Sequence, residues 1–242
     1  MNSVVVLFSG GMDSTVLLYK ALDKFDKVYA LTFDYGQRHK IELDHAIKII
    51  EKCNSKKISH KIIPAQFIRD IASTSSLTND DIQTPDVRVI RGEAQPLSYV
   101  PNRNMMFLSI ATAYAETVGA SIVWYGAAQA DSLAGYFDGD KTFIDAMNNV
   151  NILNREKRII IEAPLITLSK AQIILQGIEH KVPFDLTYTC YTGSHVADVN
   201  SASSSLRLKG FIDAGYIDPI QYIQQQSLDA VYAKHNCKKL PY

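Results

Sequence analysis

Short runs of apolar, mostly β-branched residues alternate with longer amphipathic segments through the first half of the chain. Val4 to Phe8 is the first such run, and the residues from Ser14 to Leu22 follow it with helical spacing. Alternation of this kind is typical of a parallel sheet, because each crossover helix returns the chain to the starting edge for the next strand. Right-handed crossovers place helices on both faces. The pattern therefore predicts an α/β fold with a Rossmann-like, doubly wound parallel sheet.

The same reasoning assigns the rest of the chain. Further strands are expected at 28–33, 56–63 and 122–125, and further helices at 41–53, 101–119, 141–150 and 169–180. Two polar stretches, 72–98 and 188–205, are expected to be irregular, and two short helices at 206–214 and 221–232 close the chain. We expect one α/β domain over residues 1–185 and a C-terminal loop and helical appendage over residues 186–242.

The composition argues against several classes of protein. Of the 242 residues, 25 are Lys or Arg and 25 are Asp or Glu, so the formal charge is zero. Non-specific nucleic-acid binding needs a basic surface, which this balance does not favour. No apolar run approaches the roughly 20 residues of a membrane span, and the N-terminus lacks a signal-peptide pattern. We therefore expect a cytoplasmic protein with no membrane partner and no direct nucleic-acid partner.

The loop after the first predicted strand has the chemistry of an anion site. It reads Ser9-Gly10-Gly11-Met12-Asp13-Ser14-Thr15. The glycine pair lets the backbone approach an anion closely, and the N-terminus of the following helix favours phosphate. Asp13 would repel a bare phosphate, so its expected role is helix capping or an indirect link to Mg²⁺. The alternative is a plain strand-to-helix turn with Asp13 or Ser14 as N-cap.

The string SGGMDST also resembles the SGGxDS signature of the PP-loop superfamily, the N-type ATP pyrophosphatases. The resemblance implies an adenine nucleotide α-hydrolase-like fold. Members of this superfamily use ATP to adenylate a carboxyl or carbonyl oxygen, release pyrophosphate and let a nucleophile displace AMP. It therefore implies that this chain binds ATP and Mg²⁺, with the pyrophosphate end of ATP on the loop.

Further strings narrow the resemblance. In chain order they are FDYGQRH at 33–39, VPNRNMMFLS at 100–109, YG at 125–126, GY at 135–136 and TYTCYTG at 187–193, ahead of Arg207 and Phe211. Together they resemble the 7-cyano-7-deazaguanine synthase family of the queuosine pathway across nearly the whole chain. The resemblance implies that 7-carboxy-7-deazaguanine is adenylated, that ammonia displaces AMP to give an amide, and that a second ATP converts the amide to the nitrile. It also implies small-molecule partners and a homodimer.

The match assigns roles to individual residues. The implied nucleotide-binding residues are Ser9, Gly10, Gly11, Asp13, Ser14, Thr15 and Phe33, and Ser9, Asp13 and Ser14 are also placed in catalysis together with Arg103. The implied substrate-binding residues are Gln37, Arg38, His39, Arg103, Asp131 and Tyr136. A guanidinium suits phosphate or carboxylate, which favours Arg103. The alternatives are a solvated helix start for residues 37–39, a surface arginine at 103, and a surface loop aspartate at 131.

The chain departs from the family pattern at the cysteines that bind zinc in most members. Only three cysteines occur, and Cys190 matches the first of the four zinc ligands, whereas the other three positions fall at Asp198, Ser201 and Ser204. Serine hydroxyls are poor zinc ligands. We therefore expect no zinc and no other protein-held metal site. The alternative is a three-ligand site of Cys190, His195 and Asp198.

A second departure follows the GY string. The family usually continues with DCRPEF, whereas this chain has Asp138-Gly139-Asp140-Lys141-Thr142-Phe143. The change leaves open an enzyme that stops at 7-amido-7-deazaguanine after one adenylation, or one that serves DNA rather than tRNA modification. A tRNA thiolase or lysidine synthetase is a more distant alternative, since such enzymes act on a large polyanion. A non-catalytic nucleotide-binding relative is the alternative outside enzymes.

Overall fold

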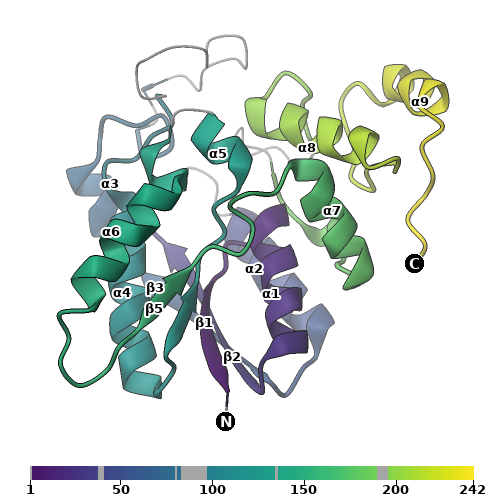
Figure 1. Cartoon of the computed structure of the whole chain (residues 1–242). Helices are drawn as coiled ribbons and strands as arrows, with labels where there is room; N and C mark the ends of the chain where they lie inside the picture. The colour runs from purple at the N-terminus through teal and green to yellow at the C-terminus, as the bar shows by residue number, and fades with distance from the viewer. Residues whose placement is uncertain (1, 38–40, 80, 83–96, 134–135, 190–195) are drawn as a thin grey trace.

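One parallel sheet of five strands organises the chain, in the order β3-β2-β1-β4-β5 (Figure 1). The structure is a computed structural model that describes residues 2–37, 41–79, 81–82, 97–133, 136–189 and 196–242. The strands are β1 (Ser3–Leu7), β2 (Lys27–Asp34), β3 (Ile58–Pro64), β4 (Ile122–Trp124) and β5 (Ile160–Glu162). Val5 in the central strand pairs with Tyr29 on one side and Val123 on the other.

Helices cover both faces of this sheet (Figure 1). On one face lie α1 (Met12–Lys24), α2 (Ile41–Cys53) and α7 (Lys170–Glu179), and on the other lie α3 (Phe67–Ile71), α4 (Arg103–Val118) and α6 (Lys141–Asn151). The short elements are α5 (Gln129–Leu133), η2 (Phe137–Gly139) and η3 (Phe184–Leu186). The expected doubly wound α/β sheet is confirmed.

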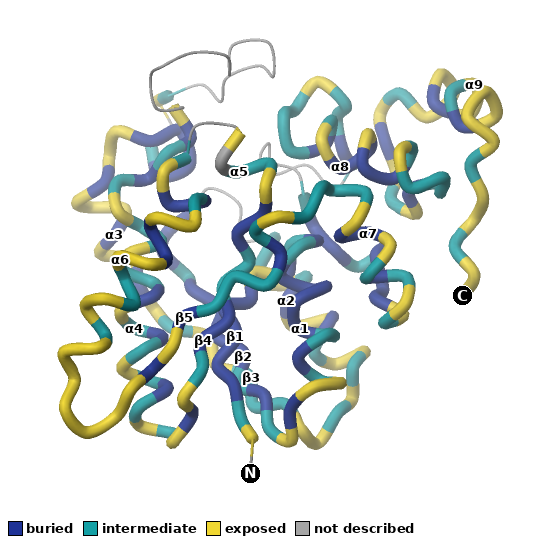
Figure 2. Tube along the Cα trace, viewed as in Figure 1, coloured by how far each residue is buried: buried dark blue, intermediate teal, exposed yellow. Residues whose placement is uncertain are grey.

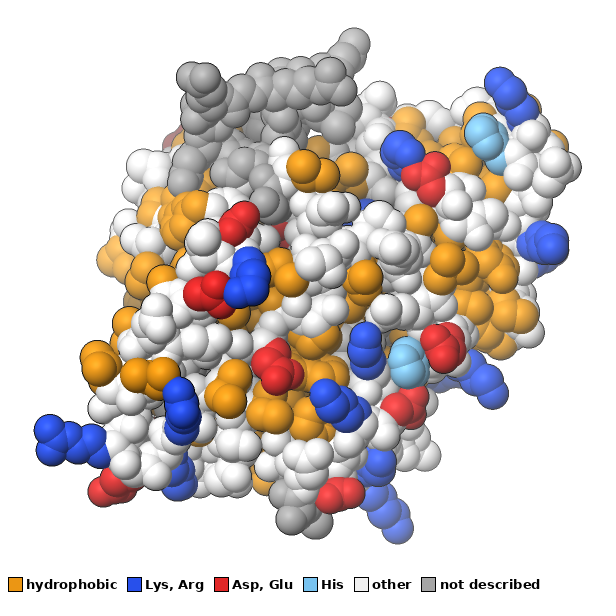
Figure 3. Space-filling view, viewed as in Figure 1, with side chains coloured by type: hydrophobic (Ala, Val, Ile, Leu, Met, Phe, Trp, Pro, Cys, Tyr) orange, Lys and Arg blue, Asp and Glu red, His pale blue; other side chains and the backbone are white. Residues whose placement is uncertain are grey.

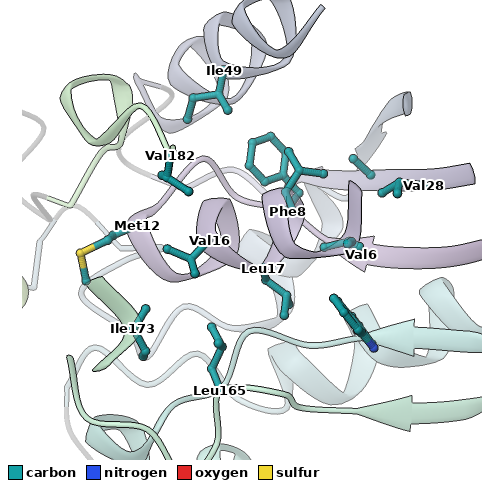
Figure 4. Packing of buried hydrophobic residues seen from close by; sticks show 14 of the residues in the cluster. Val6, Phe8, Met12, Val16, Leu17, Val28, Ile49, Leu165, Ile173 and Val182 are labelled. Atoms are coloured by element: carbon teal, nitrogen blue, oxygen red, sulfur yellow. The ribbon is translucent and has the colours of Figure 1, made fainter. Parts of the chain in front are cut away.

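Alternate side chains of β1 supply two separate cores. Val4 and Val6 point to the α1 face, whereas Val5 and Leu7 point to the α4 face. Figure 4 shows the first core, in which Val16 of α1 and Ile173 of α7 belong to one buried cluster with Val6 of β1. The dark tube of Figure 2 runs through the strands, because β1 and most of β2 are buried on both faces. Burial on both faces explains why these strands read as continuous apolar runs.

The strand order places a topological switch point beside β1. The chain runs from β1 to β2 and β3 in one direction, then crosses back to β4 and β5 on the other side of β1. The loops that leave the carboxyl ends of β1 and β4 therefore diverge, and ligands of open parallel sheets bind at such a point. The Gly10–Gly11 turn and Gly126 lie there, and a Cβ on Gly126 would be 3.8 Å from Ser14 Cα.

Two helices, α8 (Ala202–Asp213) and α9 (Gln225–Lys234), extend beyond α7 (Figure 1). They have a small apolar cluster of their own, made of Ala197, Leu208, Tyr222, Leu228 and Tyr232. Phe211 of α8 instead packs edge-on against Phe184 in the main core, with ring centroids 5.2 Å apart. We keep the division at 185/186 as a proposal, since α8 contributes to both clusters.

The expected helices and strands are confirmed to within a few residues, with one correction. Residues 202–205 are not irregular, because α8 begins at Ala202, where the Ser201 hydroxyl accepts a hydrogen bond from the Ser204 backbone N–H and caps the helix. The serine-rich composition of the segment concealed this helix start. No helix in the described part of the chain is long and apolar enough to cross a membrane.

Candidate active site

The Gly10–Gly11 turn is held against α2 by its backbone shape. Gly10 has φ +81°, and a Cβ at this position would lie 2.7 Å from the backbone nitrogen of Ala46. Gly11 is extended and is the N-cap of α1, with no side-chain cap hydrogen bond, so neither Asp13 nor Ser14 is the cap. Position 10 therefore requires glycine for two reasons: its backbone is left-handed, and α2 lies too close for a side chain.

Three hydroxyl groups tie the turn to the first turn of α1. The Ser9 hydroxyl accepts from the Gly11 N–H at 3.2 Å and lies 3.1 Å from the Ser14 hydroxyl, which can donate to the Gly11 carbonyl at 3.1 Å. Thr15 is fully buried and donates to the same carbonyl at 2.7 Å. Ser9 is exposed, whereas Thr15 is buried and its hydroxyl holds the loop by bonding to the Gly11 carbonyl. Direct contact of these hydroxyls with ATP stays a prediction.

A lysine from α7 reaches the loop. Lys170 Nζ lies 2.5 Å from Asp13 Oδ2, and both side chains are largely buried. The other oxygen, Asp13 Oδ1, is buried and has no hydrogen-bond partner among the described residues. Burial opposes the charge on Lys170, but Asp13 and Asp131 more than offset it and raise its pKa. An ammonium and an unpaired carboxylate oxygen thus meet at the start of α1.

Lys170 was not among the site residues expected from the sequence. It is 157 positions from Asp13, and nothing in the residues around it marks it as functional. One signal was available: the segment after β5 leaves the same sheet edge as the Gly10–Gly11 turn, and Lys170 opens the helix that follows. Ser169 caps that helix in a capping box with Gln172.

Asp131 lies in α5, after β4. Its Oδ2 accepts from the Ala128 N–H at 2.8 Å. Burial raises the pKa of this carboxyl, while the charge of Lys170 lowers it and that of Asp13 raises it. Lys170 therefore interacts with both carboxylates, which brings Asp131 close to the loop. It is not the solvated surface aspartate that the sequence alone left open.

Arg103 opens α4 and faces the end of β2. Its Nη1 donates to the Tyr35 hydroxyl at 3.2 Å, and its guanidinium carbon lies 5.5 Å from the Tyr35 ring centroid and 5.8 Å from that of Phe107. Burial raises the pKa of Glu42 to about 7, against the opposing charge of Arg103. Asn102 precedes the helix at φ +52° without a side-chain cap hydrogen bond. A partly buried guanidinium with aromatic walls suits a planar anion.

The altered segment at 138–143 approaches the same region. The Asn104 amide donates to Asp138 Oδ2 at 2.9 Å, and the Tyr125 hydroxyl donates to the Asp138 carbonyl at 3.0 Å. Burial raises the pKa of the Asp138 carboxyl, and Arg103 lowers it. The Tyr136 hydroxyl lies 2.6 Å from that of Ser98. The structure thus brings Arg103 close enough to Tyr136 and Asp138 for its charge to lower the pKa of both.

Two of the residues expected to bind ligands, Phe33 and Gln37, instead contact other parts of the protein. Phe33 stacks on Phe107, with ring centroids 4.0 Å apart and planes at 12°. Gln37 is buried, and its amide accepts from the Tyr35 N–H and donates to the Phe33 carbonyl, which closes the turn after β2. Arg38 and His39 lie outside the described residues. Ligand contact by these four residues stays a prediction.

The positions of the missing zinc ligands are linked by hydrogen bonds. Asp198 Oδ1 accepts from the Asn200 backbone N–H and from the Gln224 amide at 2.9 Å, while Ser201 Oγ lies 3.2 Å from Ser204 Oγ. Cys190 and His195 lie outside the described residues. Within the described ranges, no group of three or more His, Cys, Asp or Glu is placed to hold a metal. The absence of zinc stays a prediction.

Comparison with known proteins identifies the family. The family model described as queuosine biosynthesis protein QueC matches residues 3–215. The 7-cyano-7-deazaguanine synthase of Marinobacter nauticus is 40% identical over 221 residues, covering 91% of this chain and 97% of the relative. That of Thermoplasma volcanium is 39% identical over 244 residues, covering 99% and 98%.

Among solved structures, the NMN synthetase of Francisella tularensis is similar with a TM-score of 0.49 and 22% identity, over 97% of this chain and 84% of that one. The family model spans the Gly10–Gly11 turn and α7, and the two synthases match 91% and 99% of the chain. The chain therefore belongs to the queuosine biosynthesis protein QueC family.

Proposed function

We propose that this chain is an ATP-dependent ligase that converts 7-carboxy-7-deazaguanine and ammonia to 7-cyano-7-deazaguanine. The observation that carries the proposal is the Gly10–Gly11 turn at the switch point beside β1, with Lys170 and an unpaired oxygen of Asp13 beside it. The first backbone N–H groups of α1 have no acceptor within the helix and favour a bound anion. The relatives at 39–40% identity, each named 7-cyano-7-deazaguanine synthase, supply the substrate class.

The first step makes the carboxylate reactive. An oxygen of the substrate carboxylate attacks the α-phosphorus of ATP, a C–O–P bond forms, and the bond to the β-phosphate breaks to release pyrophosphate. Charge neutralisation and positioning supply most of the rate in such transfers. The loop N–H groups and the Lys170 ammonium would hold the pyrophosphate end, and Arg103 would hold the carboxylate toward the α-phosphate.

The next steps form the nitrile. Ammonia attacks the acyl carbon, AMP leaves with the former carboxylate oxygen, and the nitrogen loses a proton to give the amide. The amide oxygen then attacks the α-phosphorus of a second ATP and releases pyrophosphate, and loss of both N–H protons with cleavage of the C–O bond gives the nitrile and a second AMP. A pKa raised by burial to about 7, and the nearby charge of Arg103, support Glu42 as a group that would accept a proton near neutral pH.

Asp13 fits a role in holding Mg²⁺. A buried carboxylate oxygen without a partner is costly unless a cation or its bound water approaches it. Bound there, Mg²⁺ would neutralise charge on the phosphates. Lys170 pairs with the other oxygen of Asp13 at 2.5 Å, which leaves Oδ1 as the oxygen that would face the metal.

A small-molecule substrate fits the surface charge. On the face drawn in Figure 3, Lys and Arg side chains lie interspersed with Asp and Glu, which matches the zero formal charge of the chain. Such a mixed surface does not favour a large polyanion as the substrate. We also propose that the enzyme is a homodimer, which light scattering of the purified protein would test.

One incubation separates the candidate functions. Purified protein with 7-carboxy-7-deazaguanine, ammonium and Mg-ATP is expected to yield the nitrile by mass spectrometry, with two AMP per nitrile. One AMP per amide, with no nitrile, would favour the enzyme that stops at 7-amido-7-deazaguanine, which the altered segment around Asp138 keeps open. No AMP at all would favour a non-catalytic nucleotide-binding relative.

A further inference from the structure

The side chain of Arg207 in α8 is buried, and its Nε, Nη1 and Nη2 atoms all donate hydrogen bonds within the protein. It is 1% exposed, and its Nε and Nη2 donate to the two oxygens of Asp218 at 2.7 and 2.8 Å. Burial opposes its charge, but Asp218 more than offsets this and raises the pKa of the guanidinium. Arg207 is therefore a permanently charged group inside the protein, paired in the bidentate geometry that a guanidinium favours.

The remaining donors of Arg207 hold the segment that follows η3. Its Nη1 donates to the carbonyl and hydroxyl of Thr187 and to the hydroxyl of Thr189 at 3.0 Å, and its Nη2 donates to the Phe184 carbonyl at 2.9 Å. The residue between the two threonines is Tyr188. Arg207 thus holds the residues on both sides of Tyr188, Thr187 by its carbonyl and hydroxyl and Thr189 by its hydroxyl.

Tyr188 in turn pairs with the glycine turn. Its N–H donates to the Gly10 carbonyl at 3.1 Å, and the segment forms a parallel β-bridge with Gly11. The ring of Tyr188 lies 5.3 Å from that of His45, whose Nδ1 is 2.6 Å from the Leu186 carbonyl. The chain of contacts from Arg207 to the turn therefore has two links, the first from Arg207 to the Thr187 carbonyl and the Thr187 and Thr189 hydroxyls, and the second from the Tyr188 N–H to the Gly10 carbonyl.

A second contact connects α8 to the site. Gly210 lies one turn after Arg207, and a Cβ there would be 2.8 Å from Lys170 Cβ. The absence of a side chain at 210 lets α8 lie directly on the first turn of α7, where Lys170 starts toward Asp13. The helix thus supports both the turn and the lysine that faces it.

We propose that Arg207 is a positioning residue, which holds the Gly10–Gly11 turn in its anion-binding shape through residues 187–189. The proposal rests on the proposed function only for the identity of the anion, ATP. The tie between α8 and the turn can be measured without any ligand.

The test compares the wild type with Arg207→Lys and with Arg207→Met/Asp218→Asn. The lysine variant keeps the charge but cannot reach Asp218, Thr187 and Thr189 together, and the double variant leaves no buried charge unpaired. Leu228→Ala is the matched control, because it opens a cavity in the C-terminal apolar cluster without touching residues 187–189. Circular dichroism would establish that each variant is folded.

Hydrogen exchange on the free proteins is the first readout. Both Arg207 variants are expected to exchange the Tyr188 amide at least about tenfold faster than the wild type, while amides of β1 stay protected and Leu228→Ala leaves Tyr188 unchanged. Unchanged protection at Tyr188 in the folded Arg207 variants would overturn the proposal. So would equal acceleration in Leu228→Ala, since it would indicate general loosening.

Calorimetric titration with Mg-ATP is the second readout. Affinity is expected to fall at least about tenfold in both Arg207 variants and to stay within about twofold in Leu228→Ala. Wild-type affinity in variants with faster Tyr188 exchange would overturn the positioning role and leave the proposed function intact. A wild type that does not bind Mg-ATP would contradict the proposed function, while the exchange result would still decide whether Arg207 holds the turn.

Discussion

Replacement of Gly10 by alanine is expected to destabilise the chain much more than the same change at Gly119. Both glycines have positive φ, +81° and +75°, where a Cβ costs about 1–2 kcal/mol. Their surroundings differ. Nothing lies within 4 Å of a Cβ at 119, whereas a Cβ at 10 would be 2.7 Å from Ala46 N and 3.0 Å from Ala46 Cα and the Glu42 carbonyl. Gly119 therefore reports the cost of the backbone conformation alone.

The difference between the two losses in unfolding free energy measures the steric cost of the contact between a Cβ at position 10 and the α2 backbone. All three close atoms belong to the α2 backbone, which cannot move aside as a flexible side chain can. Overpacking of this kind costs about 1–3 kcal/mol. We therefore expect Gly119→Ala to lower the free energy of unfolding by about 1–2 kcal/mol, and Gly10→Ala by about 2–5 kcal/mol.

Urea denaturation followed by circular dichroism would measure both losses. An unchanged dependence on urea would show that the same surface is exposed in each variant, so that the midpoints can be compared. Equal losses for the two variants, within about 0.5 kcal/mol, would refute the close contact between α2 and the turn. A Gly10→Ala variant that is folded but has lost affinity for Mg-ATP would support the contact and the role of the turn together.

Three further predictions address the site. Lys170→Met is expected to lower kcat/KM for ATP by about 100-fold or more in steady-state assays. Lys20→Met is the control: it removes another contact between α1 and α7, to Gln176 Oε1 at 2.9 Å, and should keep kcat/KM within about threefold of the wild type. Similar losses in the two variants would contradict the role of Lys170. Because burial raises the pKa of Glu42 to about 7, the folded chain holds that proton more tightly than the unfolded chain. Stability should therefore fall by up to about 3 kcal/mol as pH rises from roughly 4.5 to 8. Glu42→Gln should remove this fall in urea titrations at pH 5 and 8, and an identical fall in the variant would assign it elsewhere. Metal analysis of the purified protein should find well under one zinc per chain, and stoichiometric zinc would contradict the expected loss of that site.

Long, periodic segments were predictable because burial alone determines them. The helix at 41–53 was predicted with the bounds of α2, and Gly119 ends α4 at φ +75° as a glycine after a helix commonly does. Short elements such as α3, α5 and β5 were not found, since three to five residues carry too little periodicity. The start of α8 was hidden for another reason: its serines resemble a loop, but a buried arginine and a serine cap fix the helix.

The candidate site was predictable only in part, because local sequence identifies a loop but not what packs on it. The Gly10–Gly11 turn was evident from its residues, and Arg103 from its motif. Lys170 was not, because it meets Asp13 only in the folded chain, across 157 positions of sequence. Thr15 and Gln37 illustrate the reverse case: polar residues in a binding motif whose polar groups bond to the backbone of their own loop.

The central claim is that the chain uses ATP to adenylate a carboxyl oxygen of the substrate at the Gly10–Gly11 turn. The most direct measurement uses 7-carboxy-7-deazaguanine with both carboxylate oxygens replaced by ¹⁸O, together with ammonium and Mg-ATP. Each AMP should carry one ¹⁸O, because the first takes a carboxylate oxygen and the second takes the amide oxygen. AMP without label, or no AMP, would contradict the account, since the phosphate would then never have been bonded to the substrate oxygen.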